Sequence, residues 1–144
     1  MIPESEAMAT VDRLLEASNS RDVDGIVACF SPDYRNETPV HPKRGFVGND
    51  QVRRNWTAIL GAVPDHHAEI TARVADGDIV WTEWRMGGTR PDGTRHEMVG
   101  VVIFTVGDDG LFSAARFYLE PVETDSGDVA DLLAREFAET EARP

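Results

Sequence analysis

Histidine is the side chain best suited to proton transfer near neutral pH, and one of the four histidines of this sequence stands where it could use that property. His96 belongs to an alternating run in which Met98, Val102 and Phe104 share its parity. Partial burial on such an apolar face would hold the pKa of the imidazole near or below neutrality, where it can accept a proton. We therefore interpret His96 as the candidate catalytic base. A histidine at the rim of the sheet, bonded to solvent, is the alternative.

Tyr34 is the second candidate catalytic residue. It shares strand parity with Thr38, which directly precedes Pro39, so its hydroxyl could point into the same interior as a hydrogen-bond donor. A tyrosine that buries its ring and keeps its hydroxyl in water is the alternative. Glu37 has the opposite parity and is expected to face outward, unless a bulge before Pro39 reverses it.

The nearest approach to a metal-ligand pattern is His66, His67 and Glu69. Adjacent strand residues face opposite sides of a sheet, so only His67 and Glu69 could share an ion, and two ligands are too few for a zinc site. The sequence also has no G-x-G-x-x-G, no phosphate-binding loop and no G-x-S-x-G motif. We expect no metal, no cofactor and no covalent serine or cysteine catalysis.

Four charged residues, Glu83, Arg85, Arg116 and Glu120, form a further group on the predicted strands. They could make a catalytic cluster, or they could form a lattice of cross-strand ion pairs on an outer sheet surface. Opposite charges facing each other across strands stabilise a sheet without any catalytic role. The lattice is therefore the simpler interpretation.

Apolar spacing and turn residues predict the elements that position these side chains. A helix is expected over 7–18, followed by a short helix that Asp22 caps and that ends at Ser31-Pro32-Asp33. An extended stretch over 34–38 and a loop then lead to a third helix, capped by Asn49 or Asp50.

The rest of the chain changes to β-like runs separated by the turn sequences DGD, RPDG and GDDG. Short linkers between consecutive strands imply antiparallel pairing, and a last helix is predicted over 126–141. Helices followed by a meander of strands predict an α+β fold with helices on one face of a curved, mostly antiparallel sheet. The strands are expected at 66–75, 79–90, 94–106 and 111–122.

The RPDG turn determines the register of one hairpin. Gly93 suits the left-handed position of a three-residue turn, so Arg90 should oppose Thr94, and Trp84 should then lie across from Gly100. This register makes one face of the hairpin almost wholly apolar. Such a face is either filled core or, in a sheet curved into a cone, the lining of a ligand pocket.

The amino-acid composition limits the kinds of molecule that the protein could bind. With 26 acidic and 14 basic residues the net charge is −12, which repels phosphate backbones and argues against nucleic-acid binding. No apolar run could span a membrane and the N-terminus has no signal pattern, so we expect a cytoplasmic protein with no membrane partner.

A homodimer is expected because one sheet face would otherwise expose an apolar patch of Trp81, Val99, Val101 and Ile103.

The segment SRDVDGIVACFSPDYRNETPV, followed by a helix and four strands ending in RFYLEPVE, resembles the SnoaL-like branch of the nuclear-transport-factor-two-like superfamily. The opening of a helix, D-x-D-G-I-V-A-x-F and a strand that ends before a proline are similar to ketosteroid isomerase in particular. The resemblance implies one SnoaL-like domain over 1–144, shaped as a cone around a pocket without a cofactor. It also favours Phe117 and Leu119 on the inner face.

The catalytic positions of the related enzymes fall on residues that cannot do their chemistry. The base of ketosteroid isomerase falls on Thr38, its oxyanion-hole tyrosine on Leu14 and its neutral acid on Val102. The acid of SnoaL-type cyclases also falls on Val102, and a valine neither takes nor donates a proton. The arginine and two aspartates of limonene-epoxide-hydrolase-like members have no clear match. These departures predict an absence of ketosteroid isomerase activity.

We therefore expect a protein that binds a small, mostly apolar organic metabolite, with isomerase, cyclase or hydratase chemistry as an open possibility. A non-catalytic binding or accessory module with the same pocket is the alternative, and a protein that uses the cone only to dimerise is a third. Besides His96 and Tyr34, the predicted ligand-binding residues are Thr38, Trp56, Thr82, Trp84, Met86, Met98, Val102, Phe104 and Phe117.

Overall fold

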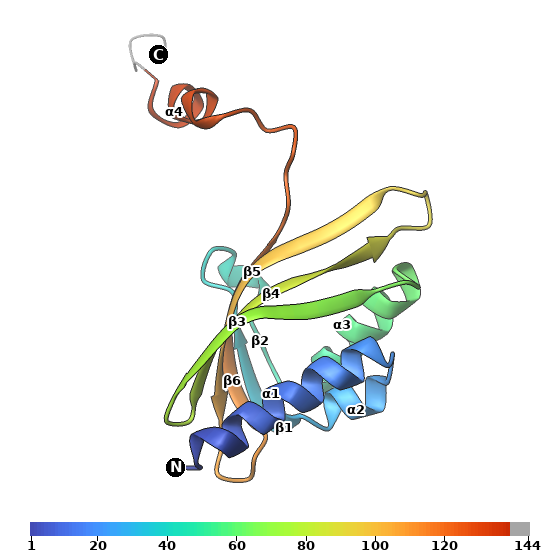
Figure 1. Cartoon of the computed structure of the whole chain (residues 1–144), viewed down its shortest axis with the longest axis vertical. Coiled ribbons are helices and arrows are strands. Elements are labelled where there is room, and N and C mark those ends of the chain that lie inside the picture. The colour runs from blue at the N-terminus through green and yellow to red at the C-terminus, as the bar shows by residue number, and fades with distance from the viewer. Residues whose placement is uncertain (139–144) are drawn as a thin grey trace.

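Residues 1–138, which the computed structural model describes, form helices and a curved sheet (Figure 1). The helices are α1 (Glu4–Asn19), α2 (Val23–Val27), α3 (Asn49–Ala62) and α4 (Val129–Phe137), with a 3-10 turn at Pro42–Arg44. The strands are β1 (Phe30–Glu37), β2 (Phe46–Val47), β3 (His67–Asp76), β4 (Ile79–Thr89), β5 (Arg95–Val106) and β6 (Phe112–Pro121).

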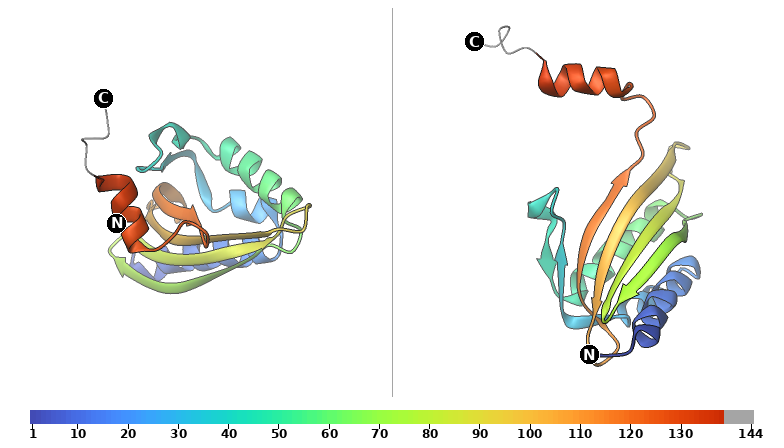
Figure 2. Two further views of the ribbon diagram at one scale, coloured as in Figure 1. Left: turned by 90° about the horizontal axis from the view of Figure 1, so that it is seen from above. Right: turned by 60° about the vertical axis from the view of Figure 1, so that its left-hand side comes forward.

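The sheet has six strands in the order β2-β1-β6-β5-β4-β3. β1 runs parallel to β6, and every other pair of neighbours is antiparallel. Helices α1 to α3 lie on the concave side, so that sheet and helices together enclose a cone (Figure 2). This is the predicted α+β architecture.

The β4–β5 hairpin has the predicted register. Arg90 donates its backbone N–H to the carbonyl of Thr94, and Trp84 pairs with Gly100. A side chain at Gly100 would place its Cβ 2.1 Å from the carbonyl oxygen of Tyr118 on β6. Only glycine therefore allows β5 and β6 to approach this closely beneath the Trp84 indole.

The helical third of the chain largely follows the prediction. α1 buries Ala7, Val11 and Leu14, and the Asp22 carboxylate accepts a hydrogen bond from the backbone of Gly25 at 2.9 Å, which caps α2. The cap predicted for α3 was wrong. Gly48, at φ 101°, precedes the first turn of α3, and the Asn49 side chain instead donates to the carbonyl of Phe30.

The predicted start of β1 was also wrong. The strand begins at Phe30 rather than 34, and it contains the Ser31-Pro32-Asp33 segment that was expected to lie before it. Its pairing with β6 shifts register between Phe30 and Arg35. A bulge of this kind accommodates a proline in a strand, because the missing N–H falls where no ladder hydrogen bond is needed.

α4 stands apart from the cone at the end of an extended segment (Figures 1 and 2). Asp128 and Asp131 form a capping box at its start, and its apolar residues are exposed. The helix was predicted over 126–141, but it begins only at Val129. The predicted positions 139–141 lie outside the described residues. No helix within residues 1–138 is long and apolar enough to cross a membrane.

Candidate functional site

A cavity of about 380 Å³ lies inside the wide end of the cone, between α3 and the inner faces of β1, β4, β5 and β6. Its wall is mostly aromatic, aliphatic and methionine side chains. Every predicted site residue except Thr82 contributes to that wall, namely Tyr34, Thr38, Trp56, Trp84, Met86, His96, Met98, Val102, Phe104 and Phe117. A second hollow, of about 440 Å³, lies beside β2 and is lined mainly by the polar β1–β2 connection.

The sequence allowed two interpretations of the apolar face of the β4–β5 hairpin, filled core or pocket lining. Each interpretation describes part of that face. Val80 and Thr82, toward the narrow end of the cone, are buried and do not reach the cavity. Trp84, Met86 and Met98, toward the wide end, line it. On β4 the face is thus filled core at Val80 and Thr82 and cavity wall at Trp84 and Met86, whereas on β5 it lines the cavity as far as Phe104.

Thr82 supports the cavity from beneath. Its hydroxyl donates to the carbonyl of Val102 at 2.7 Å and accepts the indole N–H of Trp84 at 2.6 Å. All three residues are buried, with Trp84 only 2% exposed. The indole is therefore held in one orientation by a hydrogen bond that is shielded from water.

A polar ladder on the cavity wall is formed by Tyr34 and Asn36 of β1 and by Thr38, which directly follows the strand. The Tyr34 hydroxyl donates to the amide oxygen of Asn36 at 2.8 Å, and the Asn36 amide donates to the Thr38 hydroxyl at 3.5 Å. Burial raises the pKa of Tyr34 far above its ordinary value, so the phenol stays protonated. Asn36 was not predicted as a site residue, although its parity with Tyr34 and Thr38 was a signal for it.

His96 is half-buried at the wall, and Nη2 of Arg90 lies 3.2 Å from its Nδ1. A guanidinium has no acceptor, so Nδ1 must accept in this pair, and the neutral ring then carries its proton on Nε2. Burial, and after it the Arg90 charge, lower the pKa of His96 below its ordinary value. The ring is therefore neutral at pH 7 and offers an N–H donor, and Arg90 must release Nδ1 before His96 can act as a base there.

His66 is a second polar residue on this wall, after Asn36, that sequence reasoning missed. Its side chain lines the cavity and is 5% exposed, whereas its neighbour His67 is exposed on the opposite face. Both ring nitrogens of His66 are buried without a hydrogen-bond partner among the described residues. The adjacent histidines suggested only a metal pattern; the parity of His66 with buried Ala68 was the signal that could have identified it.

The wall lacks carboxylates within residues 1–138. Leu14, Thr38 and Val102, onto which the catalytic groups of related enzymes map, all border the cavity. Glu37 is exposed, as its parity predicted. The polar groups left on the wall are the β1 ladder, Asn55, Arg44 and the two histidines.

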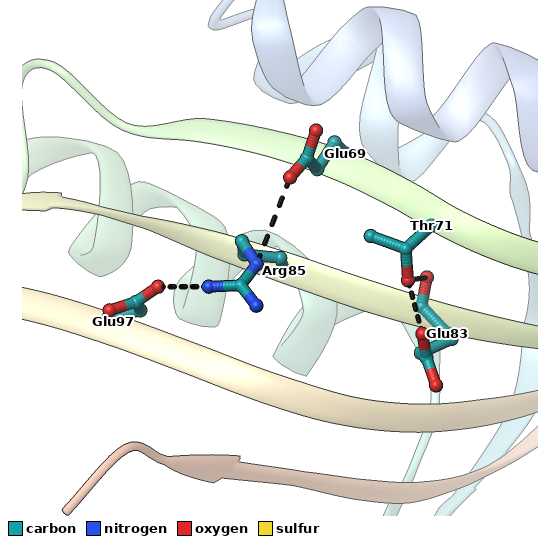
Figure 3. A network of polar contacts seen from close by, with 5 residues as sticks. All are labelled: Glu69, Thr71, Glu83, Arg85 and Glu97. Carbon is teal, nitrogen blue, oxygen red and sulfur yellow. Dashed lines mark hydrogen bonds and ion pairs between the residues drawn. The ribbon is translucent and has the colours of Figure 1, made fainter. Parts of the chain in front are cut away.

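The charged residues of β4 lie on the opposite, convex face, where Figure 3 shows their contacts. Arg85 pairs with Glu97 at 2.7 Å and with Glu69 at 3.8 Å, and Glu83 accepts a hydrogen bond from Thr71. Cross-strand ion pairs of the expected kind thus form at Arg85, but their partners are Glu97 and Glu69 rather than the four residues grouped in the sequence. Arg116 is exposed, and Glu120 pairs instead with His41. Among the described residues, no three His, Cys, Asp or Glu side chains gather as a metal site would require.

Solved structures share this fold. SalBIII, described as an epoxide hydrolase/cyclase-like enzyme in pyran ring formation in the polyether salinomycin, is 25% identical, with a TM-score of 0.72 over 87% of this chain and 97% of that one. A limonene-epoxide-hydrolase-like epoxide hydrolase from Mycobacterium tuberculosis is 23% identical, with a TM-score of 0.69 over 81% and 84%.

A further Mycobacterium tuberculosis protein, solved in complex with estradiol-17β-hemisuccinate, is 17% identical, with a TM-score of 0.68 over 78% of this chain and 92% of that one. No curated protein matches the chain in sequence. Residues 11–115 match the SnoaL-like domain, and this match spans most of the cone, from α1 to β6. The chain therefore belongs to the SnoaL-like domain family.

Proposed function

We propose that the cavity binds a small, mostly apolar organic metabolite. The observation that carries this proposal is the make-up of the cavity wall, in which aromatic and methionine side chains surround a few polar groups. Ligand sites in proteins have this composition, with polar groups that orient the ligand and apolar area that supplies affinity. The related protein with a bound steroid derivative supports the same class of ligand.

The three tryptophans provide a direct test. Trp56 and Trp84 line the cavity, whereas Trp81 is 46% exposed on the convex face. Tetralin, an apolar bicyclic hydrocarbon, should quench part of the tryptophan fluorescence at saturation. Trp56→Phe and Trp84→Phe should each remove part of that quenching, and the matched control Trp81→Phe should retain all of it. Quenching that disappears only with Trp81→Phe would place binding on the convex face and overturn the proposal.

Cofactor-free catalysis by proton transfer is the second candidate, and His96 favours it because the imidazole is neutral at the cavity wall. Isomerisation, cyclisation or addition of water would fit this chemistry. If a substrate is turned over, His96→Asn should lower the rate by about 100-fold, whereas affinity should change little because the asparagine amide keeps a hydrogen-bond donor at this position. The non-catalytic alternative draws support from the apolar residues Leu14 and Val102.

Ketosteroid isomerisation provides a negative test. Thr38, Leu14 and Val102 supply neither base nor oxyanion hole, so a Δ5-ketosteroid should isomerise no faster than in buffer. The absorbance of the conjugated product follows the reaction. A rate far above the buffer rate would show that the catalytic positions were mapped incorrectly.

A further inference from the structure

His66 and His96 face each other across a glycine. β3 and β4 pair His67 with Gly87, and β4 and β5 pair Gly88 with His96, so His66 and His96 lie on either side of Gly88. Both histidines line the cavity from the inner face. Two strand spacings of about 4.8 Å separate their backbones. Gly88 itself has no side chain, and Val63 and Asp65 pack over it.

The turn that carries His66 is held against Gly88. A Cβ at Gly88 would lie 2.4 Å from Cγ1 of Val63 and 2.5 Å from Oδ1 of Asp65. The backbone N–H of His66 donates to the carbonyl of Val63 at 3.0 Å, which closes the turn between α3 and β3. The position of His66 is therefore built into the fold.

The polar groups around His66 are engaged with other partners. The Asp65 carboxylate accepts from the backbone and hydroxyl of Thr89 at 2.7 and 2.9 Å. Arg21 donates to the carbonyls of Leu60 and Pro64. The ring of Trp56 stands perpendicular to the imidazole, with the centroids 5.5 Å apart. An imidazole buried without a partner is costly, so a residue of this kind in a built position calls for a functional explanation.

The charge state of His66 determines what it could bind. Burial lowers its pKa, and the charges of His96, Arg21 and His67 lower it further, against the opposing effect of Asp65. The neutral ring carries one N–H donor and one acceptor nitrogen. His96, with Nδ1 facing Arg90, adds an N–H donor from the other side of Gly88. A neutral ligand oxygen that accepts a hydrogen bond, or that both accepts and donates one, complements these two histidines.

We propose that the ligand is an apolar molecule bearing one hydroxyl or carbonyl oxygen, and that this oxygen binds to the imidazole of His66, at the part of the cavity wall that His96 also lines. This inference rests on the proposed function, because it assigns the orientation of the ligand in the same cavity. The His66 side chain lines the cavity while both of its ring nitrogens are buried, and a half-turn about Cβ–Cγ exchanges each nitrogen with a ring carbon. Binding therefore includes a rotation of the imidazole.

Three matched probes separate the oxygen from the apolar ring system: 2-tetralol, 2-tetralone and tetralin. Wild-type protein should bind each oxygenated probe about tenfold more tightly than tetralin, as expected for hydrogen bonds that pair a buried polar group. His66→Leu should reduce this preference to about twofold or less while retaining tetralin binding. His67→Leu, the same change one residue later on the exposed face, should keep the full preference.

Nitrogen-15 NMR of the wild-type protein tests the contact without relying on a variant. The ring nitrogens of His66 should shift on saturation with 2-tetralol and not with tetralin. Equal affinities for the three probes, or unmoved His66 resonances, would overturn this inference and leave the proposed function standing. Failure of all three probes to bind would overturn both.

Discussion

At the scale of single residues, the hydrogen bond between Thr82 and Trp84 shows how a side chain outside the cavity determines its wall. The indole N–H of Trp84 has the Thr82 hydroxyl as its acceptor, and that hydroxyl is anchored in turn on the carbonyl of Val102. A large aromatic ring on a cavity wall has open space on one side. Its orientation therefore depends on the polar contact behind it.

Thr82→Val tests this dependence with almost no change of volume. The substitution leaves a buried indole N–H without an acceptor, so the free energy of unfolding should fall by about 1–3 kcal/mol in urea titrations. Thr71→Val is the matched control, because the Thr71 hydroxyl bonds to Glu83 on the exposed face and should cost little. Equal effects of the two substitutions would show that the Thr82 hydroxyl does not support the indole.

The pair of histidines makes the stability of the protein depend on pH. The pKa values of His66 and His96 are lowered from the ordinary 6.5, chiefly by burial, whereas unfolding restores ordinary imidazoles. The unfolded chain then binds more protons below pH about 6.5, so the free energy of unfolding should fall as the pH drops through that value. Urea titrations at several pH values should show this slope, and His66→Leu should make it shallower. A slope unchanged by His66→Leu would contradict the assignment.

At the scale of elements, the curvature that opens the cavity depends on glycines at positions where another backbone segment packs closely against a strand. Gly100 lets β5 approach β6 beneath Trp84, and Gly88 admits the turn between α3 and β3. The atom that a Cβ at Gly100 would meet is a backbone carbonyl, which cannot move aside as a flexible side chain can. The paired strands must therefore separate if any side chain is introduced there.

Gly100→Ala should consequently destabilise the protein by roughly 2–4 kcal/mol, and it should weaken tetralin binding because β5 carries Met98 and Val102 of the wall. Gly61→Ala should change the stability in the opposite direction. Apart from the backbone of α3 and the neighbouring residues of the chain, no atom of residues 1–138 lies within 4 Å of a Cβ at Gly61, so alanine should stabilise the helix by up to about 1 kcal/mol. Thermal unfolding measures both changes in stability. If Gly100→Ala left the stability unchanged, the sheet would have to adapt where β5 and β6 pair at this residue.

At the scale of the whole molecule, the convex face of the sheet remains apolar in part. Of the expected patch, Trp81 is 46% exposed, whereas Val99 and Val101 are half-buried and Ile103 is buried. Val74 and Tyr118, beside the Arg85 ion pairs, add exposed apolar area at 62% and 38%. α4 adds a second exposed apolar surface, formed by Val129, Leu132, Leu133 and Phe137. Surfaces of this kind generally mark association.

We expect a twofold homodimer through the convex face, because covering Trp81 and its neighbours would remove this apolar area from water. Light scattering at micromolar concentration should give twice the chain mass, and Trp81→Lys should shift it to the monomer. Val47→Lys, at a residue 63% exposed on β2, is the control and should leave the mass unchanged. A wild-type monomer would contradict the dimer and would indicate that α4 covers this face instead.

The sequence by itself determined the order of the elements and the register of the central hairpin. Local chemistry sufficed there, since Gly93 defines the turn and alternation then assigns Trp84, Met86, Met98 and Val102 to one face. The same alternation placed Tyr34 and Thr38 inward and the charges of Glu83 and Arg85 outward. The start of β1 was not predictable, because the pairing with β6 that includes Phe30 joins segments about eighty residues apart.

Only the tertiary structure decided which inward residues meet open space. Thr82 and Trp84 share one parity, yet one is core and the other cavity wall, and Val102, which pairs with Thr82 on β5, reaches the cavity. It also decided the partners: Arg90 for His96, Asn36 for Tyr34, and none among the described residues for His66. Parity follows from the backbone of a single strand, whereas cavity volume and hydrogen-bond satisfaction depend on how distant elements pack together.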